Sequence, residues 1–167
     1  MKAAVRLVPI APADQSEFLA AVGRSRRLHD RWVAAPDTPA AFKSLVTRSR
    51  DPAHYSFVVR RADTDALVGV INITNIIRGT FHSAYLGYYA FAGHERQGLM
   101  RAALRQAVRM AFSALRLHRL EANIQPGNLA SIALVRSCGF MKEGYSPRYL
   151  KIRGRWRDHE RWALVSD

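Results

Sequence analysis

The sequence has little cysteine, a shortage of acidic residues and no long apolar run. Its single cysteine, Cys138, excludes an internal disulfide framework and favours a reducing compartment. No stretch approaches the roughly 20 apolar residues of a membrane-spanning helix. Arg6 and Pro9 interrupt the first ten residues, so no signal-peptide segment is expected there. We therefore expect a cytoplasmic protein without a membrane partner.

The shortage of acidic residues gives the chain a strongly positive charge. There are 26 basic and 13 acidic residues, for a net charge of +13. Such a surface attracts acidic partners, which favours an acidic protein substrate, or nucleic acid only indirectly through the ribosome. However, 22 of the 26 basic residues are arginine, and alanine is abundant. A GC-rich coding sequence therefore explains the charge equally well, and both interpretations stay open.

The remaining composition predicts one globular domain over residues 1–167. Hydrophobic residues make up 49% of the chain and charged residues 23%, which is typical of a domain with its own core. The apolar pattern predicts strands at residues 5–10, 55–60, 67–73, 82–91, 118–125, 140–152 and 156–165. Helices are expected after a capping box at residues 14–17, after Thr38-Pro39, from Gly98 and after Asn128. This order is a mixed α/β plan that begins with antiparallel strands.

Residues 87–104 form the stretch around which the rest of the chain is organised. An apolar run ends at Phe91, a polar loop follows, and a strongly helical pattern begins near Gly98. The first N–H groups of a helix have no intrahelical partner, and the helix dipole adds positive charge there. Gly98 allows a close backbone approach. The stretch therefore predicts a site for a pyrophosphate.

Residues 95–100, Glu-Arg-Gln-Gly-Leu-Met, resemble the cofactor loop Gln/Arg-x-x-Gly-x-Gly/Ala of the GCN5-related N-acetyltransferases, although only Gly98 matches strictly. Residues 118–140 are similar to that family's Arg-Ile-Glu-Ala, Pro-x-Asn-x-x-Ser and Gly-Phe segments. Met141-Lys142-Glu143-Gly144 and Trp156-Arg157-Asp158-His159 resemble the RimJ/RimL branch, which acetylates N-terminal amines of ribosomal proteins. The resemblance extends from about residue 5 to residue 165.

The resemblance implies a mostly antiparallel twisted sheet with flanking helices and two splayed strands, between which acetyl-CoA lies. The backbone of residues 96–101 would hold the pyrophosphate, and the backbone of residues 89–91 would pair with the pantetheine arm. Trp32 would line the acceptor pocket, with a core tryptophan as the alternative. The expected cofactor residues are Tyr89, Ala90, Phe91, Arg96, Gln97, Gly98, Leu99, Met100, Arg101 and Asn128. No metal site is expected.

Two catalytic residues are proposed on the same resemblance. Relatives often donate a proton to the departing sulfur from a tyrosine, but the corresponding residue here is Val135. Ser131 lies one helical turn earlier on the same face and is the expected substitute. The alternative is that its hydroxyl bonds the backbone of its own helix. Glu121 is the candidate base, with a salt-bridged strand carboxylate as an equal alternative.

The base is the less defined of the two roles. The family's usual glutamate position is occupied by Asn123, which cannot accept a proton. His82 and His94 are candidates only by residue type. A terminal α-amine has a pKa near 8 and is partly neutral at working pH, so a dedicated base is not required.

The sequence thus predicts an acetyl-CoA-dependent N-acetyltransferase that acts on an amine, with a ribosomal protein N-terminus as the leading acceptor. A small-molecule or antibiotic acetyltransferase is the enzyme alternative. A non-catalytic RNA- or ribosome-associated module on the same fold is the alternative from another class. A homodimer is compatible with all three.

Overall fold

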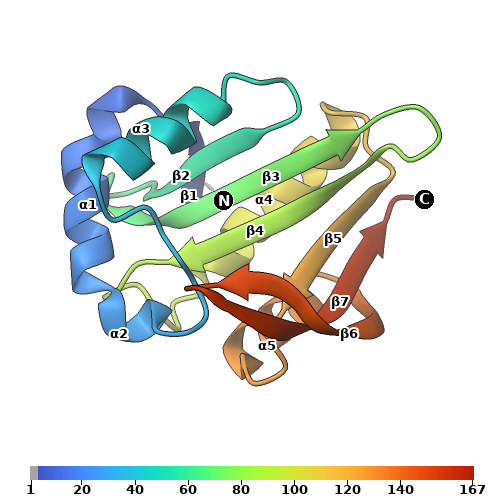
Figure 1. The fold of residues 1–167 in the computed structure, drawn as a ribbon. Coiled ribbons are helices and arrows are strands. Elements are labelled where there is room, and N and C mark those ends of the chain that lie inside the picture. The colour runs from blue at the N-terminus through green and yellow to red at the C-terminus, as the bar shows by residue number, and fades with distance from the viewer. Residues whose placement is uncertain (1–3) are drawn as a thin grey trace.

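The computed structural model describes residues 4–167; the first three residues, part of the segment considered for a signal peptide, lie outside the described residues. Seven strands form one sheet in the order β1-β2-β3-β4-β5-β7-β6 (Figure 1). The elements in chain order are β1 (Val5–Pro9), the 3-10 turn η1 (Pro12–Asp14), α1 (Gln15–Arg24), α2 (Arg26–His29), α3 (Pro39–Arg48), β2 (Tyr55–Arg61), β3 (Leu67–Ile77), β4 (Ser83–Ala90), α4 (Leu99–Ser113), β5 (Arg119–Ile124), α5 (Leu129–Ser137), β6 (Met141–Ile152) and β7 (Arg155–Val165). Within residues 4–167, no helix is both long and apolar enough to cross a membrane.

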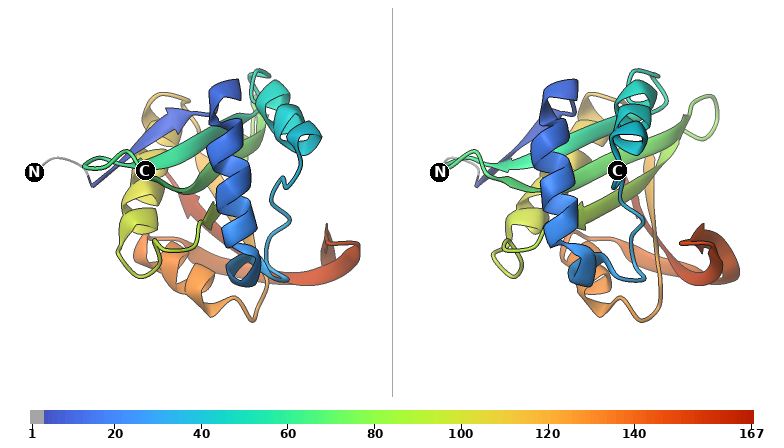
Figure 2. Two further views of the ribbon diagram at one scale, coloured as in Figure 1. Left: turned by 90° about the vertical axis from the view of Figure 1, so that its left-hand side faces the viewer. Right: turned by 60° about the vertical axis from the view of Figure 1, so that its left-hand side comes forward.

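Helices cover both faces of the sheet, and each face has its own core (Figure 2). On one face, Phe18 of α1 packs against Phe42 of α3 with ring centres 4.9 Å apart, and against Phe91 at 5.6 Å. On the other face, α4 crosses β1 to β3 and buries a side rich in alanine. The buried residues of that side are Leu99, Ala103, Leu104, Ala107 and Ala111. Small alanine side chains allow the helix to lie close to the strands.

The sheet is antiparallel except at its centre, where β4 and β5 run parallel. Their pairing covers only Ser83–Tyr85 against Arg119–Glu121. Beyond this segment the two strands diverge (Figure 1). This confirms the expected mixed α/β fold with two splayed strands, and it leaves one edge of β4 free from residue 86 onward.

Two of the three predicted helix caps are confirmed. The Thr38 side chain accepts a hydrogen bond from the Ala41 N–H at 3.2 Å. The Asn128 side chain accepts one from the Ser131 N–H at 3.3 Å. Both bonds satisfy a first-turn donor, as expected for N-cap residues.

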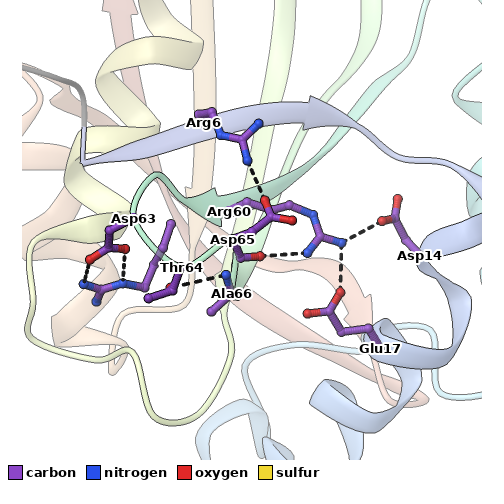
Figure 3. Close-up of polar contacts among 9 residues, drawn as sticks. Arg6, Asp14, Glu17, Arg60, Asp63, Thr64, Asp65 and Ala66 are labelled. Atoms are coloured by element: carbon purple, nitrogen blue, oxygen red, sulfur yellow. Dashed lines mark hydrogen bonds and ion pairs between the residues drawn. The ribbon is translucent and has the colours of Figure 1, made fainter.

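The predicted capping box at residues 14–17 is wrong. A 3-10 turn precedes α1, and the Asp14 carboxylate accepts from the Ala11 N–H at 2.8 Å. Asp14 and Glu17 also lie 2.8 and 2.9 Å from the guanidinium of Arg60 on β2 (Figure 3). Asp14 and Glu17 therefore bind Arg60 on the sheet, and they do not form the reciprocal side chain-to-backbone bonds of a capping box.

Candidate active site

A cavity of about 720 Å³ opens beside β4 where its pairing with β5 has ended. Its walls come from α2, the end of β4, the loop and first turn of α4, and the start of α5. Ten of the thirteen predicted site residues line it: Trp32, Tyr89, Ala90, Arg96, Gly98, Leu99, Met100, Arg101, Asn128 and Ser131. The structure thus brings together residues that are up to 99 positions apart in the sequence.

The loop before α4 presents backbone N–H groups to this cavity. Arg96 and Gly98 have left-handed φ values of 58° and 73°. The first intrahelical bond runs from Ala102 N–H to the Gly98 carbonyl at 3.1 Å, so the N–H groups of residues 99–101 precede it. The first turn of α4 contains no acidic residue, and the carboxylate of Glu95 in the preceding loop, which also lines the cavity, accepts from the Gly93 N–H at 2.7 Å. This end of α4 can hold an anion.

Gln97 belongs to the loop but not to the cavity wall. Its side-chain amide donates to the Gly93 carbonyl at 3.1 Å and accepts from Arg61 at 2.9 Å. These bonds fix the shape of the loop from outside. The structure therefore gives Gln97 a supporting position where direct contact with a ligand was predicted.

The free edge of β4 is formed by Tyr88 and Ala90. The Phe91 N–H donates to the Val68 carbonyl on β3 at 2.7 Å. Because backbone groups alternate between the two edges of a strand, those of Tyr88 and Ala90 point away from β3. The Ala90 carbonyl indeed accepts from His29 Nε2 at 2.8 Å. Of the predicted residues 89–91, Phe91 is fully buried and its N–H is bonded within the sheet, whereas Tyr88, which the prediction did not include, lies on the free edge.

Ser131 is held by Tyr88 at its hydroxyl and by Asn128, which accepts from its backbone N–H. Its hydroxyl oxygen lies 2.7 Å from the phenol oxygen of Tyr88. The hydroxyl makes no bond to its own helix, whereas the Ser137 hydroxyl donates to the Leu134 carbonyl at 2.7 Å. Burial raises the pKa of the Tyr88 phenol well above its usual range, so this group stays protonated. Val135 is fully buried in the core and offers no hydroxyl.

Glu121 lies outside the residues that line the cavity. Its carboxylate accepts from Arg119 Nε at 2.7 Å, and Arg119 also pairs with Glu143. The geometry is that of the salt-bridged strand carboxylate, the alternative considered for this residue. Of the two histidine candidates, His94 lines the cavity and His82 does not.

His29 is a buried titratable residue on the cavity wall that the sequence analysis did not single out. Its ring is 3% exposed and packs edge-on against Tyr89 with centres 5.3 Å apart. Burial lowers its pKa, while the bond to the Ala90 carbonyl acts in the opposite direction. His29 lies three residues before Trp32, which lines the same cavity. The guanidinium carbon of Arg31 lies 4.6 Å from the centre of the Trp32 ring.

Comparisons with known proteins agree with this arrangement. Residues 4–141 match the model of the family described as "Acetyltransferase (GNAT) domain". The [ribosomal protein uS5]-alanine N-acetyltransferase of Escherichia coli is 42% identical over 104 residues, which are 62% of the chain and 54% of that relative. The spermidine N(1)-acetyltransferase of Vibrio cholerae is 25% identical over 89% of the chain and 86% of its own length. The chain thus spans about half the length of the first of these relatives.

Among solved structures, RimJ of Mycobacterium smegmatis, in complex with CoA-disulfide, superimposes with a TM-score of 0.89. It is 26% identical and the alignment covers 97% of the chain and 82% of that protein. The sheet, its splayed strands and the helices around the cavity are therefore those of an acetyltransferase fold.

Proposed function

The chain belongs to the GNAT acetyltransferase family, and we propose that it transfers the acetyl group of acetyl-CoA to the N-terminal α-amine of a protein. One observation carries the proposal. A single cavity contains the free N-terminal turn of α4, the free edge of β4 and the paired hydroxyls of Tyr88 and Ser131. These are an anion site, a hydrogen-bonding edge and a proton donor, which are the features that binding and cleavage of an acetyl-CoA thioester require.

We assign the pyrophosphate to the loop at residues 96–101. Backbone N–H groups at the start of a helix bind phosphates without a charged side chain. Arg101 lines the same wall, and its guanidinium could add a charged contact. The pantetheine arm would then pair with the backbone groups of Tyr88 and the N–H of Ala90, because the Ala90 carbonyl already accepts from His29, and Asn128 would contact it from α5.

Ser131 acts on the leaving group in this scheme. The amine nitrogen attacks the acetyl carbon, a C–N bond forms, and the C–S bond breaks to release a thiolate. In this scheme the Ser131 hydroxyl donates a hydrogen bond to that sulfur. The Tyr88 phenol oxygen lies 2.7 Å from the Ser131 hydroxyl oxygen and 3.3 Å from the Ser131 carbonyl, and it would donate to the hydroxyl oxygen. A donor held in place before the reaction stabilises the developing charge without reorganisation.

The amine attacks in its neutral form, and the proton that its nitrogen loses as the amide forms passes to water or to the released thiolate, so no side chain is assigned as a base. An α-amine with a pKa near 8 is partly neutral at working pH. Glu121 stays a prediction as a base, and its pairing with Arg119 at 2.7 Å argues against that role.

We also propose that residues 1–167 form one domain in the cytoplasm. The family match ends at residue 141, yet β6 and β7 continue the same sheet and β7 pairs with β5. A ribosomal protein acceptor places the enzyme in the cytoplasm, and the lone Cys138 agrees with a reducing compartment.

A small-molecule amine is the second candidate acceptor, favoured by the similarity to a spermidine acetyltransferase. A screen of CoA release with ribosomal N-terminal peptides, free amino acids and polyamines tests both. Turnover with peptides supports the proposal, and turnover confined to small amines replaces it with the alternative. Calorimetric binding of acetyl-CoA with no turnover on any amine, together with salt-dependent RNA binding, would indicate the non-catalytic module.

A further inference from the structure

A second cavity, of about 580 Å³, lies between the loop after α2 and the β6–β7 hairpin. Arg153 in the hairpin turn donates from Nε to the Val33 carbonyl in that loop at 3.2 Å, so the two segments touch (Figure 1). His29 lines both this cavity and the one that contains Ser131. The two cavities therefore meet at His29.

Arginine dominates the charged wall of the second cavity. Its charged residues are Arg26, Arg31, Arg153, Arg157, Asp30 and Asp37. None of these six forms an ion pair within residues 4–167, although Arg60 and Arg119 each pair with two carboxylates elsewhere. The wall thus carries more positive than negative charge, and within residues 4–167 none of its arginines forms an ion pair with a carboxylate.

Arg157 supplies the most specific observation. Its Nε atom is buried and has no hydrogen-bond partner among the described residues. This atom has almost no accessible surface, so the terminal nitrogens of Arg157, which form no hydrogen bond within residues 4–167, are the atoms that can bind an anion in the cavity. Burial lowers the pKa of the neighbouring His29, and the positive charge of Arg153 acts in the same direction.

We propose that the second cavity binds a carboxylate of the acceptor and so selects amines that carry an acidic group close by. The inference rests on the proposed function, because it takes the amine to reach Ser131 past His29. Guanidinium groups bind carboxylates through charge-assisted and often bidentate hydrogen bonds. The same wall repels polyamines, whose additional positive charges would face unpaired arginines.

A carboxylate beside an amine has two sources. One is an aspartate or glutamate near a protein N-terminus, and the other is the α-carboxylate of a free amino acid. Peptides beginning Ser-Glu-Glu, Ser-Gln-Gln and Ser-Lys-Lys test the first source. Free serine and its carboxamide test the second source, and spermidine tests repulsion. We expect the Glu peptide to exceed the Gln peptide about 10-fold in kcat/KM, and the Lys peptide to be poorest.

Three variants assign that preference to the cavity. Arg157→Gln and Arg153→Gln should each reduce the Glu-over-Gln ratio several-fold. Arg109→Gln, on the exposed face of α4, removes the same charge elsewhere and should leave the ratio unchanged. Arg153→Glu should improve the Lys peptide, a gain that loss of folding cannot imitate. A ratio of one in the unmodified protein, or a ratio that all these variants preserve, would overturn the proposal.

A binding measurement separates this inference from the proposed function. Calorimetry with the CoA-loaded protein compares N-acetylated Glu and Gln peptides and needs no turnover. Transfer to all peptides with equal affinity for the two would refute the anionic subsite alone. Absence of transfer to any amine would refute the proposed function, while a tighter-binding Glu peptide would still support the subsite.

Discussion

The phenol of Tyr88 and the hydroxyl of Ser131 lie 2.7 Å apart and connect the free edge of β4 to the first turn of α5. This bond crosses the gap that opens where β4 and β5 diverge. If the phenol donates to the serine oxygen, the serine proton is left free to point into the cavity. The pair therefore orients a donor at the place where the proposed reaction releases a thiolate.

The first prediction tests this pair. Ser131→Ala should lower the single-turnover rate by roughly 100- to 1,000-fold with acetyl-CoA affinity nearly unchanged, because a donor used in the transition state is lost. Tyr88→Phe should lower it about 10-fold, the effect of one hydrogen bond that orients another group. The double variant should be no slower than Ser131→Ala alone. Tyr55→Phe on β2 is the matched control and should leave the rate unchanged. If the rate losses of the two single variants add in the double variant, Tyr88 and Ser131 act independently.

The second prediction concerns Gly98. Its φ of 73° and the open space around it suit asparagine and aspartate, which tolerate left-handed backbone. Gly98→Asp places a carboxylate at the start of α4 and should weaken acetyl-CoA binding about 10-fold or more relative to Gly98→Asn. Both variants should melt at similar temperatures, because either side chain can cap the helix. If calorimetry gives the two variants equal affinities for acetyl-CoA, the phosphates do not bind at this loop.

Local patterns predicted the secondary structure well where the deciding contacts are local. Thr38 and Asn128 cap their helices as their sequence context indicates. Asp14 and Glu17 did not form a capping box, because the deciding partner, Arg60, is 46 and 43 residues away in the sequence. The family pattern also selected Ser131 and Gly98, which line the same cavity, because both belong to short motifs.

Contacts between distant elements account for the rest of the site. Alternate residues of a strand face the same edge, so Tyr88 could have been identified from its spacing to Ala90. Only the bond from Phe91 to Val68, however, shows which residues of β4 face away from β3. His29 reaches the Ala90 carbonyl from 61 residues away, and no motif near it signals this contact. The second cavity depends on the hairpin at Arg153 meeting the loop after α2, which sequence spacing does not reveal.

The third prediction concerns Gly69 on β3. A Cβ atom there would lie 2.5 Å from the Tyr89 carbonyl and 2.8 Å from the Met100 sulfur. Gly69→Ala must therefore shift the end of β4, at a cost of about 1–3 kcal/mol in stability, and should weaken acetyl-CoA binding. Gly87→Ala is the control, because its nearest atom would be 4.0 Å away. Equal melting temperatures for both variants would contradict the close packing of β3 on this edge.

The basis of the last prediction is a pair of buried histidines. His29 and His159 are each 3% exposed. Burial lowers the pKa of both, and hydrogen bonds to the Ala90 and Arg157 carbonyls act in the opposite direction without cancelling the effect. The unfolded chain binds protons at these residues near pH 6.5. The folded chain binds them only at lower pH.

The fourth prediction follows from that difference in proton uptake. Because the unfolded state binds more protons between about pH 7 and 5, the free energy of unfolding should fall as pH falls through this window. Each histidine contributes at most about 1.4 kcal/mol per pH unit. The paired carboxylates Asp63 and Asp158, whose pKa values are also lowered, lose their contribution only at more acidic pH.

Urea denaturation of the apo protein from about pH 8 to 5 measures the slope of the free energy of unfolding against pH. His159→Gln should roughly halve it, whereas His54→Gln in the loop before β2 should not. A flat profile in the unmodified protein would mean that neither buried ring resists protonation.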